Sequence, residues 1–303
     1  MGAPTFTLGA IGARWYPLTM NRTLTVVLAA SALVAGCAPP PQADPEFSDA
    51  ARFAFREFDT EEPADLAFAI RALETVVLAD MDLEAESAAD RWVAPEFLTD
   101  EDVAGIDHPD YPVNEGLPVA VGKISQFPVS AHPEYLALAD QTPVEPGGPQ
   151  YDRTFLEGSD ACWPSNDCEW MRTENHLIKQ NFLLRVEYDL FKDYRWVDLN
   201  LPAPSTVPEG EPIVNEGEPR WAIAARSWTD QVWVGEEGEN EIQLSFSFEV
   251  WIPQDDGTTT RLLALWSRTN LNDGNEDATI QNVIRGGIEN IFVAQEEYLV
   301  GDE

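Results

Sequence analysis

The stretch EIQLSFSFEVWIPQDDGTTTRLLALWSRT, residues 241–269, decides the fold. In its first half every second residue is apolar: Ile242, Leu244, Phe246, Phe248, Val250 and Ile252. A period of two residues is typical of a β-strand that buries one face. Asp256-Gly257 then supplies the turn residues of a hairpin, and residues 258–269 form the return strand. The sequence therefore predicts an antiparallel hairpin here.

Further strands are expected before this hairpin. Alternation predicts one strand over residues 184–190, and a second over residues 194–199 after a short turn at Lys192-Asp193. Residues 221–234 form another strand region. Most of residues 92–176 reads as irregular because it is rich in proline, with one strand within residues 117–129. We expect a meander of about five to six strands in total.

Helices are predicted at both ends of the domain. Asp44-Pro45 can start the first, because Asp caps helices and Pro suits a first turn. The second should start near Thr60. The last should end near Leu299, and Gly286-Gly287 within it favours close packing or a kink, because glycine weakens a helix. Their apolar stripes are Phe47, Ala51, Ala54, Phe55 and Phe58; Leu66, Ile70, Leu73, Val77 and Met81; and Ile280, Val283, Ile284, Ile288, Ile291 and Phe292.

Helices, an antiparallel meander and a final helix make an α+β fold. We expect residues 46–303 to form one globular domain, in which a curved sheet wraps the C-terminal helix and buries its own apolar stripe against it. This order of elements is similar to that of helix-grip (START-like) domains, which hold apolar ligands between sheet and helix. The strand that such domains place before their helices is missing from this sequence.

Residues 20–37 have the layout of a bacterial export signal. Met20-Asn21-Arg22 begins a basic segment, residues 24–34 are apolar, and Ala35-Gly36 precede Cys37. The apolar run is too short for a membrane span, which needs about 20 residues. The pattern resembles the lipobox of bacterial lipoproteins, which signal peptidase II cuts before a lipidated cysteine. The resemblance implies that the signal peptide, residues 1–36, is removed and that Cys37 carries the lipid; the alternative is an ordinary cleaved signal. Because the signal layout begins at Met20, we expect translation to start there.

The expected mature chain begins with a tether. Residues 37–45 comprise the lipidated Cys37 and a proline-rich tether, which should be extended and semi-rigid. Ala38 stands where many inner-membrane lipoproteins have Asp, which by analogy favours the outer membrane. We therefore expect an exported protein that is anchored in the bacterial envelope by its lipid.

The charge of the chain excludes one class of partner. There are 54 acidic residues against 18 basic ones, for a formal net charge of −36. Such a polyanion is repelled by phosphate backbones, so nucleic-acid binding is not expected. The acidic surface is explained by solubility or a salty medium, and a cationic partner or bound divalent cations are the alternative.

Cys162 and Cys168 remain after cleavage, and in an oxidising compartment we expect them to form a disulfide. A metal site would add His176 as a third ligand, but a fourth is not evident. The spacing is not the Cys-x-x-Cys of redox enzymes.

Motifs of catalysis are missing. The histidines are His108, His132 and His176, and none belongs to a His-Glu-x-x-His or Gly-x-Ser-x-Gly context. The acidic run from Asn272 to Asp277 resembles a calcium loop in composition, but the glycine and the final glutamate of an EF-hand are absent. We therefore expect no catalytic, cofactor-binding or metal-binding residues.

Five tryptophans lie in the β-rich half and could pack in the core or line a ligand platform: Trp221, Trp228, Trp233, Trp251 and Trp266.

These observations favour a non-enzymatic envelope lipoprotein that binds a ligand or partner, either a protein or a small apolar molecule, or has a structural role. The alternative is a carboxylate-based hydrolase. A pair of acids, one with a raised pKa, in a tryptophan-lined cleft would favour the hydrolase. A closed apolar cavity between sheet and last helix would favour ligand binding.

Overall fold

The computed structural model describes residues 43, 45–85, 91–180, 185–202, 218–235, 240–271 and 277–301. All of them belong to one compact unit, Pro39–Glu303. The predicted export signal, Cys37 and most of the calcium-like run, residues 272–276, lie outside the described residues. Within the described part, no helix is both long and apolar enough to span a membrane.

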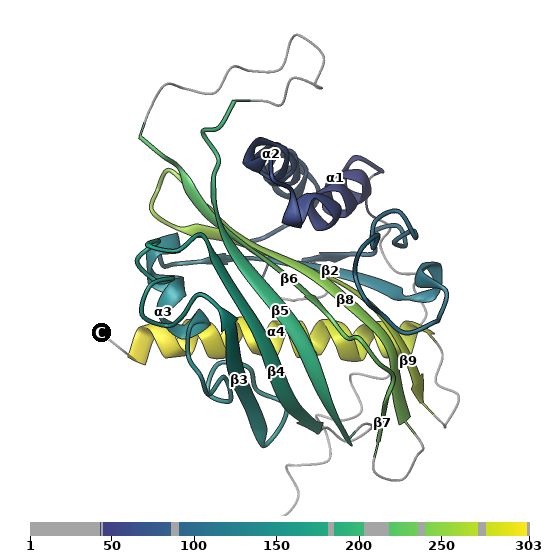
Figure 1. Cartoon of the computed structure of the whole chain (residues 1–303). Coiled ribbons are helices and arrows are strands. Elements are labelled where there is room, and N and C mark those ends of the chain that lie inside the picture. The colour runs from purple at the N-terminus through teal and green to yellow at the C-terminus, as the bar shows by residue number, and fades with distance from the viewer. Residues whose placement is uncertain are drawn as a thin grey trace, which may run out of the picture. The chain divides into compact units, whose positions relative to one another are not determined.

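One antiparallel sheet forms the centre of the domain (Figure 1). Its spatial order is β1-β2-β9-β8-β6-β5-β4-β3, and β7 pairs with β8. The strands are β1 Trp92–Val93, β2 Leu117–Ser125, β3 Gln150–Glu157, β4 Trp170–Gln180, β5 Arg185–Asp198, β6 Trp221–Trp228, β7 Trp233–Val234, β8 Asn240–Pro253 and β9 Thr259–Leu271. The predicted hairpin is β8–β9, and Gly257 adopts φ +86° in its turn, a conformation that favours glycine.

In the described part of the chain the sheet has nine strands, so the prediction of about five to six was too low. The added strands include β3 and β4, which occupy a stretch that we read as irregular. On β4 the inward positions include polar residues, with Thr173 and Asn175 fully buried between Met171 and Leu177. A strand that buries polar side chains lacks the apolar period of two, and so gives no strand signal.

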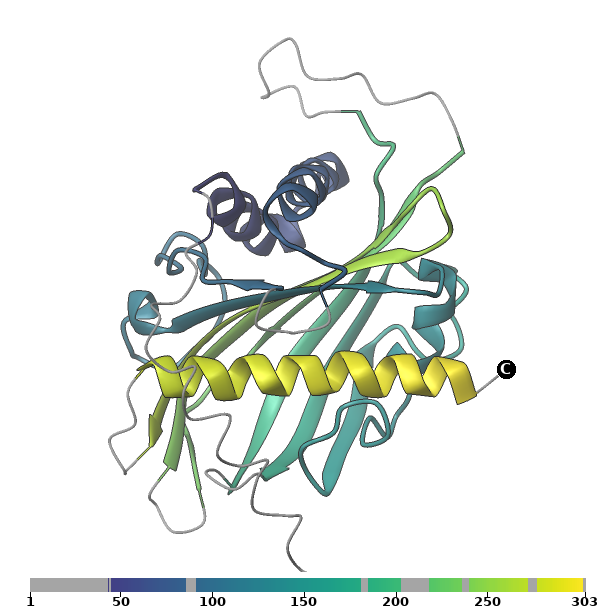
Figure 2. The same cartoon turned by 180° about the vertical axis from the view of Figure 1, so that it is seen from behind.

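Helices cover both faces of the sheet (Figures 1 and 2). The pair α1 and α2 lies on one face and the long α4 lies across the other, so the C-terminal helix packs on the sheet as predicted. The helices are α1 Pro45–Arg56, α2 Pro63–Asp80, α3 His132–Leu136 and α4 Asp277–Gly301, with 3-10 turns η1 Glu57–Asp59, η3 Val113–Glu115 and η4 Val129–Ala131.

The apolar stripe of β8 faces α1 and α2, and not the last helix as we expected. Phe246 meets Phe55 of α1 edge to face, with ring centroids 6.0 Å apart, and Leu244 and Phe248 belong to the same core. The two N-terminal helices bring wide apolar faces that only the apolar side of the sheet can match. The other face of the sheet is therefore left to less apolar residues.

The α4 face has a smaller apolar core. Ile288 and Phe292 of α4 pack on Val119, Val121 and Leu263 of β2 and β9. Trp251, which the alternation places out of phase with the stripe, is fully buried on this side. It packs in the interior and does not form an exposed platform.

Strand β5 contradicts the turn that we predicted at Lys192-Asp193. The strand runs without a break from Arg185 to Asp198, and it pairs with β4 and β6 at both positions. Adjacent residues of a strand point to opposite faces, so Lys192 enters the α4 side and Asp193 the α1–α2 side. Both are buried.

Gly286 and Gly287 are not closely packed, contrary to expectation. A Cβ atom at either position would meet no atom within 4 Å, and the helix continues through both residues.

We expect Gly287→Ala to raise the free energy of unfolding by about 1 kcal/mol, because glycine is the poorer helix former. Urea unfolding measures this. Gly122→Ala is the contrasting variant, since its Cβ would lie 2.8 Å from Sδ of Met81 and should destabilise. A Gly287→Ala variant less stable than wild type would contradict the prediction.

Candidate functional site

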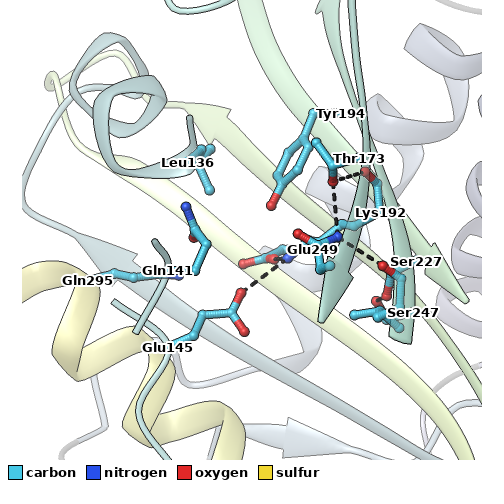
Figure 3. Close-up of polar contacts among 12 residues, drawn as sticks. Leu136, Gln141, Glu145, Thr173, Lys192, Tyr194, Ser227, Ser247, Glu249 and Gln295 are labelled. Atoms are coloured by element: carbon cyan, nitrogen blue, oxygen red, sulfur yellow. Dashed lines mark hydrogen bonds and ion pairs between the residues drawn. The ribbon is translucent and has the colours of Figure 1, made fainter. Parts of the chain in front are cut away.

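A cluster of ionisable side chains is buried on the α4 side of the sheet. At its centre is Lys192 of β5, which is 6% exposed. Its ammonium lies 3.3 Å from the carboxylate of Glu249 on β8 and 3.5 Å from that of Glu145 in the loop before β3. Figure 3 shows these three side chains pointing toward one another. Burial of charge is costly unless partners hold it, so such a cluster needs an explanation.

Arg261 of β9 links this centre to α4. Its guanidinium donates to the Glu249 carboxylate at 3.0 Å and to the side-chain oxygen of Gln295 on α4. The ring of Phe292, also on α4, lies 4.3 Å from it. Arg261 and Gln295 are almost fully buried. The last helix is therefore held to the sheet by a charged side chain as well as by apolar contacts.

Arg153 of β3 is a buried cation with neutral partners. It donates from Nε to the Asn175 side-chain oxygen at 2.9 Å, from Nη2 to the Tyr194 hydroxyl at 2.8 Å and from Nη1 to the carbonyl of Leu136. Among the residues that the structure describes, no carboxylate forms an ion pair with it, although it is only 6% exposed. A guanidinium has five donors, so part of its capacity is unused.

The cluster reaches the surface at Lys179 of β4. Its ammonium lies 3.8 Å from the Glu145 carboxylate, and its side chain is 23% exposed. It also lies 5.5 Å from the ring centroid of Tyr151 on β3. Lys179 and Glu145 thus form the outer end of a chain of charges that runs inward to Lys192.

Aromatic side chains close the inner end. Trp251 Nε1 donates to the hydroxyl of Tyr135 at 3.1 Å, and this hydroxyl lies 2.9 Å from Nδ1 of His132. Burial, together with the nearby Arg261, holds the pKa of His132 well below its usual value. His132 is therefore neutral at pH 7 and adds no charge to the cluster.

The central groups are ionised. Burial lowers the pKa of Lys192, but Tyr194, Glu249 and Glu145 outweigh it and hold the pKa well above its usual value. Burial raises the pKa of Glu145, yet Lys192, Lys179 and Arg153 lower it further, and the net shift is downward. A protonated lysine is no nucleophile and an ionised glutamate is no general acid. Lys192 and Glu145 can therefore attract and orient a polar group, and neither is poised to transfer a proton near neutral pH.

Several buried polar atoms around the cluster lack a hydrogen-bond partner in the described residues, among them the Tyr151 hydroxyl, Oε1 of Gln141 and Nε of Arg261. Tyr151 is 1% exposed, and the charges of Glu145 and Lys192 act on it. Buried polar groups are nearly always paired, and an exception asks for a water or a ligand. The unpartnered atoms and the buried charges occupy the same region.

The carboxyl group whose pKa shows a net rise, that of Asp193, lies outside the cluster. Burial raises the pKa of Asp193 to about 6 against the opposing effect of Arg172 and Arg226. Asp193 is on the α1–α2 side of the sheet, away from Glu145 and Glu249. The acid pair that would favour a hydrolase, one of them with a raised pKa, is therefore not assembled in the buried cluster.

The predicted disulfide joins Cys162 and Cys168, whose Cα atoms are 5.5 Å apart. It closes the turn before β4. Trp163 in this turn is fully buried, and its carbonyl accepts from Trp196 Nε1 at 2.8 Å. The bridge thus holds a loop over the α4 face of the sheet.

The histidines do not converge. His176 is partly exposed and pairs with Asp189 at 2.8 Å and Glu187 at 3.2 Å, while the cysteines that would have joined it in a metal site are bonded to each other. His108 packs edge to face on Phe246. Within the part of the chain that the structure describes, no three metal-ligating side chains gather at one point.

Two surface hollows lie outside the cluster. One, of about 440 Å³, is formed by α1 and α2 with Phe53, Phe68 and Ala69 among its lining residues. The other, of about 510 Å³, lies beside α3 and is lined by Pro133, Glu134 and Asp160 among others. Neither is the closed apolar cavity between sheet and α4 that would have favoured an apolar ligand.

No family model matches the chain, and no curated protein matches its sequence. Solved structures do show a likeness. The protein TTHA0849 from Thermus thermophilus is 13% identical with a TM-score of 0.40, over 61% of this chain and 99% of that one. The human StAR-related lipid transfer protein 5 is 6% identical with a TM-score of 0.40, over 79% and 97%. The Zhui aromatase/cyclase from a Streptomyces species is 12% identical with a TM-score of 0.34, over 61% and 92%.

This likeness is coarse. What this chain itself has is an antiparallel sheet with a long C-terminal helix. Fold alone does not determine function, and the lipid transfer and the aromatase/cyclase activity in those names belong to those proteins. What this chain binds has to be argued from its own side chains.

Proposed function

We propose that this protein is a lipid-anchored binding protein of the bacterial envelope, more specifically of the outer membrane. The anchor is the lipid on Cys37, and residues 38–45 are the tether. The export-signal layout before Cys37 supports this placement. A modified cysteine with its acyl chains gives stable anchoring where one chain alone would be marginal.

Binding rather than catalysis is supported by one observation, the buried charged cluster around Lys192. A core that served stability alone would use apolar side chains there, since replacing buried ion pairs by packed apolar residues is often neutral or stabilising. The cluster contains ionised groups and unpartnered polar atoms, which suit recognition of a polar ligand. It lacks the acid with a raised pKa that hydrolysis would need.

The anchor is tested by Cys37→Ser in an exporting bacterium. We expect the wild-type chain to incorporate labelled palmitate and to sediment with membranes, and the variant to lose the label and the membrane association. The control is the Cys162→Ser/Cys168→Ser double variant, which retains Cys37 as the only cysteine and should keep its label. A Cys37→Ser chain that is still acylated would overturn the proposed anchor.

Binding is tested by native mass spectrometry of the chain purified without denaturation from the same host. We expect a retained mass that leaves on denaturation. The acyl groups on Cys37 are covalent and stay, so the two kinds of added mass are distinguished. A polypeptide that carries only covalent mass in repeated preparations would contradict a binding role and favour a structural one.

A further inference from the structure

The charges of the buried cluster do not balance. Four cations belong to it, Lys179, Lys192, Arg153 and Arg261, against two carboxylates, Glu145 and Glu249. Its formal charge is therefore positive by two, inside a chain whose net charge is −36. General solubility explains an acidic surface, but it gives no reason to collect cations in the interior.

One of the two excess charges is that of Arg153, and the other arises because Lys179 shares Glu145 with Lys192. Lys192 and Arg261 each meet a carboxylate at 3.5 Å or less, whereas Arg153 meets only the neutral oxygens of Asn175, Leu136 and Tyr194. An arginine cannot lose its proton in a protein, so burial does not neutralise it. The Glu145 carboxylate acts on Arg153 only from beyond ion-pair distance, and Glu145 is already shared with Lys192 and Lys179. A buried charge held this weakly is unfavourable unless an ion compensates it.

Unused donors surround the same point. The Tyr151 hydroxyl has no partner among the described residues, and the charges of Glu145, Lys192 and Arg153 act on it. Arg153 itself retains N–H groups beyond the three that are engaged. A guanidinium, a phenol and a nearby ammonium form the donor set with which proteins hold carboxylate and phosphate oxygens.

We propose that the interior between β3, β5 and the segment from Leu136 to Glu145 binds a small anion, bearing a carboxylate or a phosphate group, with Arg153 as the pairing cation and the Tyr151 hydroxyl as a further donor. This inference rests on the proposed binding function and names its ligand class. The ligand enters at the outer end of the cluster, where Lys179 is partly exposed. Lys192 and Arg261 neutralise the two carboxylates of the cluster and leave Arg153 to the ligand.

The test is the thermal midpoint of the full chain at pH 7 with increasing succinate or inorganic phosphate, at constant ionic strength set with sodium chloride. Neutral succinamide and cationic 1,4-diaminobutane are the matched probes of other charge. We expect the thermal midpoint to rise saturably with at least one anion and not to rise with the neutral or cationic probe, because a ligand stabilises the state that binds it.

Two variants locate the site. Arg153→Gln should abolish the rise, but it can also fail to fold. Tyr151→Phe is the safer variant, since it removes a hydroxyl that has no partner among the described residues, and it should weaken the anion affinity by about tenfold, the effect of one hydrogen bond to a charged group. The control is Tyr111→Phe, a half-buried tyrosine beside Arg268 outside the cluster, which should bind as wild type does.

The outcomes separate the two proposals. Stabilisation only by the neutral or cationic probe, or equal anion affinity in wild type and Tyr151→Phe, overturns the anion site and leaves a binding role intact. If no probe stabilises the chain and native mass spectrometry finds no retained mass, both fail. An anion effect that Tyr151→Phe weakens and Tyr111→Phe does not affect supports the proposal.

Discussion

Replacing Lys192 by methionine should lower the free energy of unfolding by about 3–5 kcal/mol, the usual result of removing one partner from a buried ion pair. Methionine fills a similar volume, so the loss is mainly electrostatic. The variant leaves Glu145 and Glu249 facing each other without the ammonium that now lies 3.5 and 3.3 Å from them. The raised pKa of Lys192 already indicates that its surroundings favour the charge, despite burial.

A less buried lysine gives the matched control. Lys123 lies 3.7 Å from Glu289 with both side chains about one fifth exposed, and Lys123→Met should cost less than about 1 kcal/mol. Adding Glu249→Gln to Lys192→Met should recover part of the loss, and the double-mutant cycle isolates the coupling between the two groups. Urea unfolding of wild type and these variants measures both. A Lys192→Met variant as stable as Lys123→Met would show that the ammonium contributes nothing to the fold.

The elements that the sequence predicts well are those with strong apolar periods. Leu66 to Met81 and Phe47 to Phe58 predict the two N-terminal helices, and Ile242 to Ile252 predicts β8. Periodicity says which residues share a face, but it does not say which helix that face meets. For this reason the stripe of β8 could be assigned to the wrong side of the molecule, to α4 instead of α1 and α2.

One sequence feature does indicate that Lys192 is buried, but we interpreted Lys192-Asp193 as a turn and so missed it. Lys192 continues, in phase, the alternation that leads from Leu190 to Tyr194 and Trp196. A strand that keeps its period through a charged residue places that residue on the buried face. Lys-Asp reads equally well as a polar turn, because Asp is a frequent turn residue. The pairing with Glu145 joins a strand to a distant loop without periodicity, and only the fold brings them together.

Asp193, on the opposite face of the same strand, makes the stability of the protein depend on pH. Burial raises its pKa to about 6, and the nearby Asp59 and Glu157 add to the shift, although Arg172 and Arg226 oppose it. The pKa in the unfolded chain is about 3.9. The folded state therefore binds the proton more tightly. The contribution of the protonated group is fully present below about pH 4 and is lost as the pH rises through about 6, a loss of about 3 kcal/mol at pH 7.

Asp193→Asn should remove this dependence, because an amide keeps the shape of the protonated acid and does not ionise. We expect the variant to equal wild type in free energy of unfolding near pH 4 and to exceed it by up to about 3 kcal/mol at pH 7. The measurement is urea unfolding at several pH values from about 4 to 8. The quantity compared is the difference in free energy of unfolding between the variant and wild type, in which the contributions of other titrating groups cancel. Asp100→Asn, in an exposed loop, is the control and should show no trend. If the Asp193→Asn difference in free energy of unfolding instead fell with pH, the attraction of Arg172 and Arg226 for the Asp193 carboxylate would outweigh burial, and Asp193 would be a stabilising charge.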